Sequence, residues 1–181
     1  MALSSVRSDD EDGNHGNTAH IRRFYAVCVV IRGMYVSVIG GSSVDHDTAQ
    51  VADAVGQRLA TRGHVVVCGG LGGVMEAVCR GATRAGGETI GILPTDSRAD
   101  ANEHVTIPIA TGLGHGRNAL VVMNGDAAIA IDGSHGTLAE IGLALAHGRA
   151  VAGLDTHEVT GVEAVDSPRG AVEYVEQHGT Q

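Results

Sequence analysis

The sequence predicts a single α/β domain of Rossmann type, with a doubly wound, mostly parallel sheet flanked by helices. Short, continuous aliphatic runs alternate with helical segments from Tyr35 onward. Continuous apolar runs are typical of strands buried on both faces, and so of a parallel sheet. The 181 residues suit one domain, and with one Phe, three Tyr and no Trp its core must close through aliphatic side chains.

The predicted strands are these aliphatic runs, at residues 35–39, 64–68, 89–93, 105–109, 127–131 and 150–154. Helices are predicted between them, ending near residue 62 and then over 73–85, 117–123 and 137–147. Asp47 and Gln50 form a capping-box pattern at the start of the first helix, and Gly63 supplies its left-handed stop. Ser167 and Pro168 predict the cap and first turn of a last helix.

Residues 1–33 differ from the rest, and we interpret them as a disordered or non-native extension before a nucleotide-binding domain over 34–181. The stretch 8–14 is polar and acidic. The apolar run 24–31 is about eight residues long, too short to span a bilayer, and it could instead add an edge strand. Because the regular pattern begins at Tyr35, Met34 could be the true start, and we expect the preceding residues to be dispensable.

The composition excludes several classes of function. The net charge is −9 and all twelve basic residues are arginines, which argues against a nucleic-acid surface. An acidic, lysine-free composition also resembles proteins of salt-loving organisms. Three cysteines without CxxC spacing fit a reducing cytoplasm and no disulfide framework. Ten scattered histidines give no metal-ligand spacing, so we expect no metal site. Since the apolar run 24–31 is too short to span a bilayer, we also expect no membrane segment.

Three glycine-rich loops follow predicted strands directly, at residues 40–43, 69–75 and 132–137. In a doubly wound sheet they share the carboxyl edge, where ligands bind. Glycine lets the backbone approach a ligand, and N–H groups at a helix N-terminus favour phosphate. The alternative is that they are only tight turns. The candidate phosphate-binding residues are Gly41, Ser42, Gly69, Gly70, Gly72, Gly73, Val74, Met75, Gly133, Ser134, His135, Gly136 and Thr137.

Neither common phosphate-binding fingerprint is met. A P-loop needs the lysine of its GK[ST] end, and this chain has no lysine. The Gly-x-Gly-x-x-Gly dinucleotide fingerprint does not follow the first predicted strand.

The second and third loops carry a family resemblance. Gly-Gly-x-x-Gly-Val-Met-x-Ala-Val at 69–78 resembles the first signature of the LONELY GUY (LOG) proteins, long labelled lysine decarboxylases. Gly-x-x-Gly-Thr-x-x-Glu at 133–140 resembles their second signature, Pro-Gly-Gly-x-Gly-Thr-x-x-Glu. His115-x-Arg117 matches their Met-His-x-Arg stretch. The resemblance covers about residues 35–154. The sequence at 72–78 and the compact length look closer to the molybdenum-cofactor-carrier-like branch of this superfamily.

The resemblance implies hydrolysis of the N-glycosidic bond of a nucleoside 5′-monophosphate. Glu140 would stabilise the positive charge that develops on the sugar, and Arg117 would hold the phosphate. Two alternatives remain open. Thr137 and Glu140 also form a capping box, and Arg117 could be a solvated charge, although an arginine at a helix start opposes the helix dipole and so suggests an anionic partner.

Two functions therefore stay open. One is a phosphoribohydrolase, and the other is a non-catalytic carrier or sensor of a nucleotide or of molybdenum cofactor. We expect no cofactor to be required. Asp132 and Ser134 replace the Pro and second Gly of the second signature, Asn118 replaces a Lys, and Ala139 replaces a frequent Glu. We expect ligand binding to survive these departures, which count against turnover.

We also expect a homodimer. The helix predicted at 137–147 has Leu138, Ile141, Leu143 and Leu145 around most of its circumference. A helix on a sheet buries only one apolar stripe, so the remaining apolar side chains call for a second partner. LOG proteins pair through helices, which points the same way.

Overall fold

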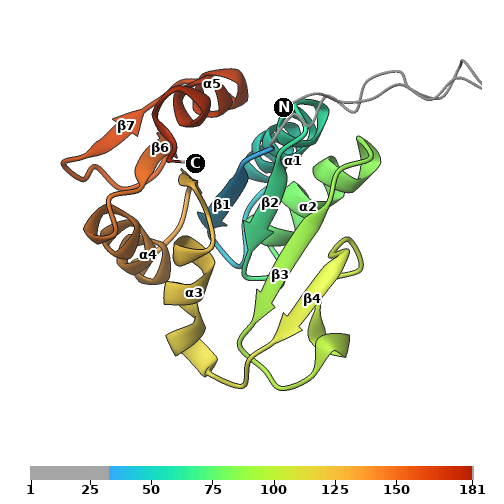
Figure 1. Cartoon of the computed structure of the whole chain (residues 1–181). Coiled ribbons are helices and arrows are strands. Elements are labelled where there is room, and N and C mark those ends of the chain that lie inside the picture. Colours follow the sequence, from blue (N-terminus) through green and yellow to red (C-terminus); the bar gives the residue numbers. More distant parts are fainter. Residues whose placement is uncertain (1–32, 181) are drawn as a thin grey trace, which may run out of the picture. The chain divides into compact units, whose positions relative to one another are not determined.

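The computed structural model describes residues 33–180, and the interpretations of residues 1–32 lie outside that range. Residues 33–180 form one parallel sheet in the order β4-β3-β2-β1-β5-β6-β7, flanked by helices (Figure 1). The strands are β1 (Tyr35–Gly40), β2 (Val65–Cys68), β3 (Thr89–Leu93), β4 (Ile107–Ala110), β5 (Ala127–Ile131), β6 (Ala150–Leu154) and β7 (Val162–Ala164). The helices are α1 (His46–Thr61), α2 (Val74–Arg84), α3 (Asn118–Met123), α4 (His135–Ala146) and α5 (Pro168–His178), with 3₁₀ turns η1 (Arg98–Asp100) and η2 (Gly114–Arg117).

Helices cover both faces of the central strands, as the continuous apolar runs predicted. Successive residues of a strand point to opposite faces. Val36 and Val38 of β1 therefore pack with α1, α2 and α5 on one face. Ile39 packs on the other face with Val121 of α3 and Ile141 of α4. The result is the Rossmann-like fold expected from the sequence.

The strand predictions were confirmed for β3, β5 and β6 and needed adjustment elsewhere. β2 begins one residue late because the amide of His64 still bonds to the carbonyl of Leu59 at the end of α1. β4 begins at Ile107 because Val105 is still in a turn closed on Asn102. β7 was not predicted, since three residues carry too short a pattern to detect.

The start of α1 was predicted wrongly. Its N-cap is Asp45, whose side chain accepts the N–H of Thr48 at 2.8 Å, and not Asp47. The Gln50 side chain contacts His46 and takes no part in a capping box. Asp47 instead lies in the first turn, where its charge favours the helix dipole.

The other two helix signals were correct. Gly63 has φ +80° just after α1, which is the left-handed stop predicted for it. Ser167 caps α5 by accepting the N–H of Gly170 at 3.1 Å, with Pro168 in the first turn.

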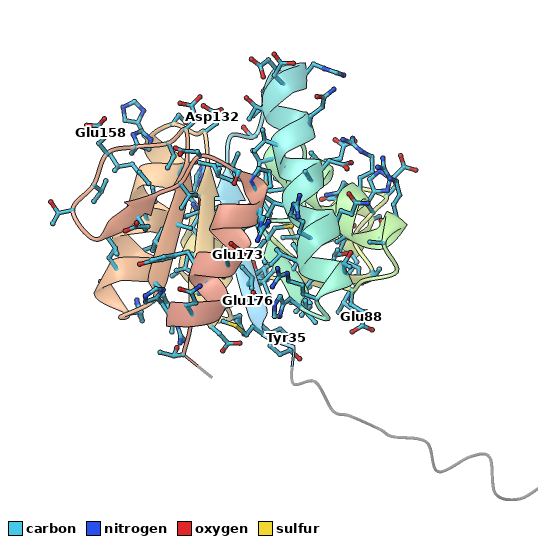
Figure 2. All side chains as sticks on the ribbon, turned by 90° about the horizontal axis from the view of Figure 1, so that it is seen from above. Tyr35, Glu88, Asp132, Glu158, Glu173 and Glu176 are labelled. Carbon is cyan, nitrogen blue, oxygen red and sulfur yellow. The ribbon has the colours of Figure 1, made fainter. Side chains whose placement is uncertain are left out.

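His64 joins the start of β1 to the last helix. Its Nδ1 accepts the amide of Met34 at 3.1 Å, which requires the proton on Nε2, and Nε2 donates to Glu176 of α5 at 2.8 Å. Figure 2 shows Glu176 on α5 close to Tyr35, at the amino end of β1.

We expect His64→Ala to lower the free energy of unfolding by about 2 kcal/mol, because it leaves a buried amide without a partner. Urea unfolding measures the loss. His46→Ala, at an exposed histidine of α1, is the control. Equal stability of the two variants would contradict a structural role for the His64 bonds.

The sheet order reverses direction between β1 and β5. From β1 the chain moves outward through β2 to β3 on one side, and from β5 it moves outward to β6 on the other. In doubly wound sheets ligands bind at the carboxyl ends of the strands at this reversal. Figure 2 shows Asp132 and Glu158 at that end of the strands, with Tyr35 and Glu88 at the opposite end.

Candidate functional site

A cavity of about 440 Å³ lies at the carboxyl ends of β1, β2 and β5. Its volume is within the range of small-molecule sites. Its walls come from all three glycine-rich loops and from the η2 turn. It is lined by Val38, Ile39, Gly40, Gly41, Ser42, Gly69, Leu71, Met75, Pro94, Gly114, His115, Arg117, Asn118, Ser134, Gly136, Thr137 and Glu140.

Arg117 is buried in the wall of this cavity. It is 7% exposed and ends the η2 turn just before α3. Its Nη1 donates to the side chain of Asn118 at 2.5 Å and its Nη2 to the carbonyl of Gly69 at 3.3 Å. Within residues 33–180 its Nε has no hydrogen-bond partner. A buried guanidinium with an unsatisfied donor is a strong recognition group for an anion.

The Gly69 backbone leaves room for this guanidinium. A Cβ at Gly69 would collide with Nη2 of Arg117. Gly69, which was predicted as a phosphate contact, therefore has a packing role: it leaves room for the side chain of Arg117 in the cavity wall.

Glu140 lies beside Arg117 in the wall of the cavity. Its Oε1 lies 3.7 Å from Nη1 of Arg117, and the residue is 7% exposed. Burial raises the pKa of Glu140 to about 7, although the charge of Arg117 acts in the opposite direction. Burial also lowers the pKa of Arg117, which Glu140 partly opposes. The carboxyl thus changes charge near neutral pH.

The capping-box alternative for Glu140 is wrong. The N-cap of α4 is Ser134, and Thr137 lies inside the first turn. Thr137 therefore cannot pair with Glu140 as a cap. The side chain of Glu140 is left free for the cavity.

The N-terminus of α4 is open. The side chain of Ser134 makes no capping bond, and the first helical bond runs from the amide of Leu138 to the carbonyl of Ser134. No acceptor within residues 33–180 takes the amides of residues 135–137. Ser134, Gly136 and Thr137 line the cavity, so these amides are available to an anionic ligand.

The N-terminus of α2 is partly occupied by the protein itself. The amide of Val74 donates to the carbonyl of Gly41 at 2.9 Å, whereas the amides of Met75 and Glu76 have no acceptor within residues 33–180. Gly73 has φ +67°, and a Cβ there would collide with the backbone of Gly41 and Ser42. The second glycine loop therefore packs on the first, which takes the first amide of α2.

The structure brings together part of the predicted site. Gly41, Ser42, Gly69, Met75, Arg117, Ser134, Gly136, Thr137 and Glu140 line the cavity. The other predicted residues do not line it: Gly70, Gly72, Gly73, Val74, Gly133 and His135. Val74, the first residue of α2, is fully buried in the core, and His135 is exposed.

Sequence reasoning missed several walls of the cavity. Leu71, Pro94 and Gly114 were not proposed, His115 was named only as part of the family stretch, and Asn118 only as a departure from the family pattern. Pro94 directly follows a predicted strand, so the rule that ligands bind at carboxyl ends could have found it.

Two thiols lie behind the second loop. Cys68 and Cys79 are both buried, with their Sγ atoms 3.5 Å apart, and the amide of Gly70 donates to Cys68 at 3.3 Å. The hydrogen bond with Cys68 and burial raise the pKa of the Cys79 thiol. The third cysteine of the sequence, Cys28, lies outside the described residues.

Two absences hold for residues 33–180. No group of three His, Cys, Asp or Glu side chains there could hold a metal ion. No helix there is long and apolar enough to cross a membrane.

The Rossmann-like sheet and the cavity at its reversal point agree with the LOG-like superfamily that the two signatures predicted. The chain belongs to the SLOG cluster4 family, whose sequence profile matches residues 33–181. It is 42% identical over 142 residues to an uncharacterized protein of Archaeoglobus fulgidus, covering 78% of this chain and 93% of that one.

Two solved structures extend the likeness. The molybdenum cofactor binding protein of the phototrophic bacterium Rippkaea orientalis is 32% identical, with a TM-score of 0.76. The molybdenum cofactor carrier protein of Chlamydomonas reinhardtii is 30% identical, with a TM-score of 0.73. Each match covers 81% of this chain and 98% of the other. The predicted closeness to the molybdenum-cofactor-carrier-like branch agrees with both.

Proposed function

We propose that the protein binds one phosphorylated small molecule in the cavity at α4 and holds it without converting it, as a carrier or sensor. The observation that carries the proposal is the open N-terminus of α4 in a cavity that the buried guanidinium of Arg117 also lines. The free amides can donate to a phosphate, and the guanidinium supplies a positive charge for it.

We place the phosphate of the ligand at the start of α4, which is the phosphate seat of the proposal. The amides of residues 135–137 all lack an acceptor within residues 33–180, whereas at α2 the carbonyl of Gly41 takes the first amide. A monophosphate ester fits this arrangement.

The rest of the ligand meets apolar walls. Leu71, Met75 and Pro94 line the cavity and suit a flat ring, such as a nucleobase or a pterin. Molybdenum cofactor as cargo fits in this respect, with its phosphate at α4 and its ring on these side chains. Its metal would meet no three-residue ligand group within residues 33–180. The likeness to two molybdenum-cofactor proteins over nearly their whole length supports this cargo over others.

Hydrolysis of a nucleoside 5′-monophosphate is the second candidate. It is favoured by the Arg117–Glu140 pair at 3.7 Å. The Glu140 carboxylate would stabilise an oxocarbenium-like state, and Arg117 would hold the phosphate. Asp132 and Ser134 count against it, since they depart from the signature of the hydrolases that the sequence resembles.

The two candidates separate in one experiment. The purified protein is mixed with AMP, GMP and CMP, and in parallel with molybdenum cofactor released from a molybdoenzyme. Binding is followed by calorimetry, cofactor retention by pterin fluorescence and molybdenum content after gel filtration, and turnover by release of free base. Retention without base release is the expected result. Base release from any nucleotide assigns the hydrolase, and no binding of any ligand rejects both.

The affinity for AMP should fall as the pH rises through about 7. Below that pH Glu140 is neutral, and above it the carboxylate repels the phosphate and competes for Arg117. We expect about a tenfold fall between pH 6 and 8, relative to Glu140→Gln. That variant is the control because AMP itself gains charge in this range. Parallel pH curves for both proteins would show that Glu140 does not titrate in the cavity.

The homodimer predicted through the fourth helix stays a proposal. Leu138 of α4 is 41% exposed, and Leu143 and Leu145 are half-buried, so this helix keeps apolar surface after folding. We expect a dimer in sedimentation at micromolar concentration, weakened by Leu138→Glu. The exposed Ala146→Glu, near the other end of α4, is a matched charge control. A monomer of the unmodified chain rejects the dimer.

A further inference from the structure

The loop that enters α4 has a backbone conformation unusual for its residues. Asp132 has φ +50° and Gly133 has φ +114°. Non-glycine residues rarely adopt positive φ, although Asp tolerates it better than most. Such a loop persists only when its surroundings hold it in place.

Two side chains from the connection between β6 and β7 hold this loop. The hydroxyl of Thr156 donates to the carbonyl of Asp132 at 2.6 Å. Nε2 of His157 lies 3.0 Å from the carbonyl of Ser134. A carbonyl can only accept, so His157 must carry its proton on Nε2. The two bonds bracket Gly133 on both sides.

The loop has one further anchor, which is the sheet. The amide of Asp132 donates to the carbonyl of Leu154 at 3.1 Å, on the strand that leads into Thr156. The end of β6 and the residues after it therefore fix the segment 132–134 through three hydrogen bonds. That segment sets where the open amides of α4 point.

We infer that Thr156 and His157 are positioning residues for the phosphate seat at α4. This rests on the proposed function, because it concerns the same seat. Neither side chain lines the cavity, so neither touches the ligand. They act by keeping Asp132–Ser134 in the conformation that presents residues 135–137 to the cavity.

Four variants of the full chain test the inference, with AMP as the probe. Thr156→Val removes the hydroxyl and keeps the methyl that packs near Gly153, whereas Thr156→Ser keeps the hydroxyl. His157→Leu removes the donor, and His157→Gln can restore it with its amide. Thr160→Val, at an exposed residue of the same connection, is the control.

We expect Thr156→Val and His157→Leu each to raise the dissociation constant for AMP about fivefold, the effect of one lost hydrogen bond. Thr156→Ser and His157→Gln should bind like the unmodified protein. Hydrogen exchange without ligand should be faster at the amides of Asp132 and Leu138 in the double variant Thr156→Val/His157→Leu. Both amides are bonded at the two ends of the loop.

Unchanged exchange at both amides overturns the inference, as does weaker binding by Thr156→Ser that equals that of Thr156→Val. If the unmodified protein does not bind AMP, the nucleotide form of the proposed function fails. The exchange measurement then decides the inference by itself.

Discussion

Arg117→Ala is expected to weaken the binding of a phosphate-bearing ligand by about 1.5–3 kcal/mol, roughly tenfold to 150-fold. The residue is 7% exposed and lines the cavity. Its charge is therefore largely removed from bulk water, so its attraction for a phosphate is little screened. Calorimetric titration with AMP measures the loss.

Two further arginine variants make this result specific. Arg98→Ala removes the same charge from an exposed position on η1 and should leave affinity unchanged. Arg117→Lys keeps the charge but replaces the planar fork, whose two Nη atoms donate to Asn118 and Gly69, with a single ammonium nitrogen, so it should recover only part of the affinity. Equal affinities of Arg98→Ala and Arg117→Ala would place the phosphate elsewhere.

Glu140→Gln tests the partner of Arg117 in the same cavity wall. It keeps the shape of the side chain and removes the charge, so binding should persist. If base is released at all, the rate should fall by about two orders of magnitude, since stabilisation of the developing cation is lost. Glu163→Gln on β7 is the exposed control. Undiminished base release by Glu140→Gln would remove the carboxylate from the chemistry.

The fold could be predicted from the sequence because its signals are local and repeated. A continuous aliphatic run such as 127–131 predicts both a strand and the burial of that strand on two faces. Gly63 and Ser167 mark helix ends through their own backbone or side-chain chemistry. The three-residue β7 has no such redundancy, and its pairing with β6 depends on tertiary contacts alone.

The site was harder to predict because glycine loops of similar sequence differ in which backbone amides they leave free for a ligand. Nothing local distinguishes the helix start at Ser134, whose three first amides have no acceptor within residues 33–180, from the one at Gly73, whose first amide is taken. The difference comes from the carbonyl of Gly41, which follows β1 more than thirty residues earlier in the chain and accepts the amide of Val74. The pairing of Arg117 with Glu140 is likewise a product of the strand order, not of spacing.

Asp132→Pro is expected to lower the free energy of unfolding by about 3 kcal/mol or more. Proline is the residue of the LOG signature at this position, but its ring fixes φ near −65°, and Asp132 has φ +50°. Proline also removes the amide that donates to the carbonyl of Leu154 at 3.1 Å. The loop must therefore rearrange, and the start of α4 with it.

Asp132→Gly separates conformation from chemistry. Glycine adopts positive φ without strain, which offsets its greater freedom in the unfolded chain, so stability should change by about 1 kcal/mol or less. Asp132→Asn keeps the shape and the tolerance of positive φ and removes only the charge. Urea unfolding of the three variants, with AMP titration of each, checks the argument. If Asp132→Pro is as stable as Asp132→Gly, residue 132 tolerates the φ near −65° that proline requires. That result would contradict the positive φ of Asp132.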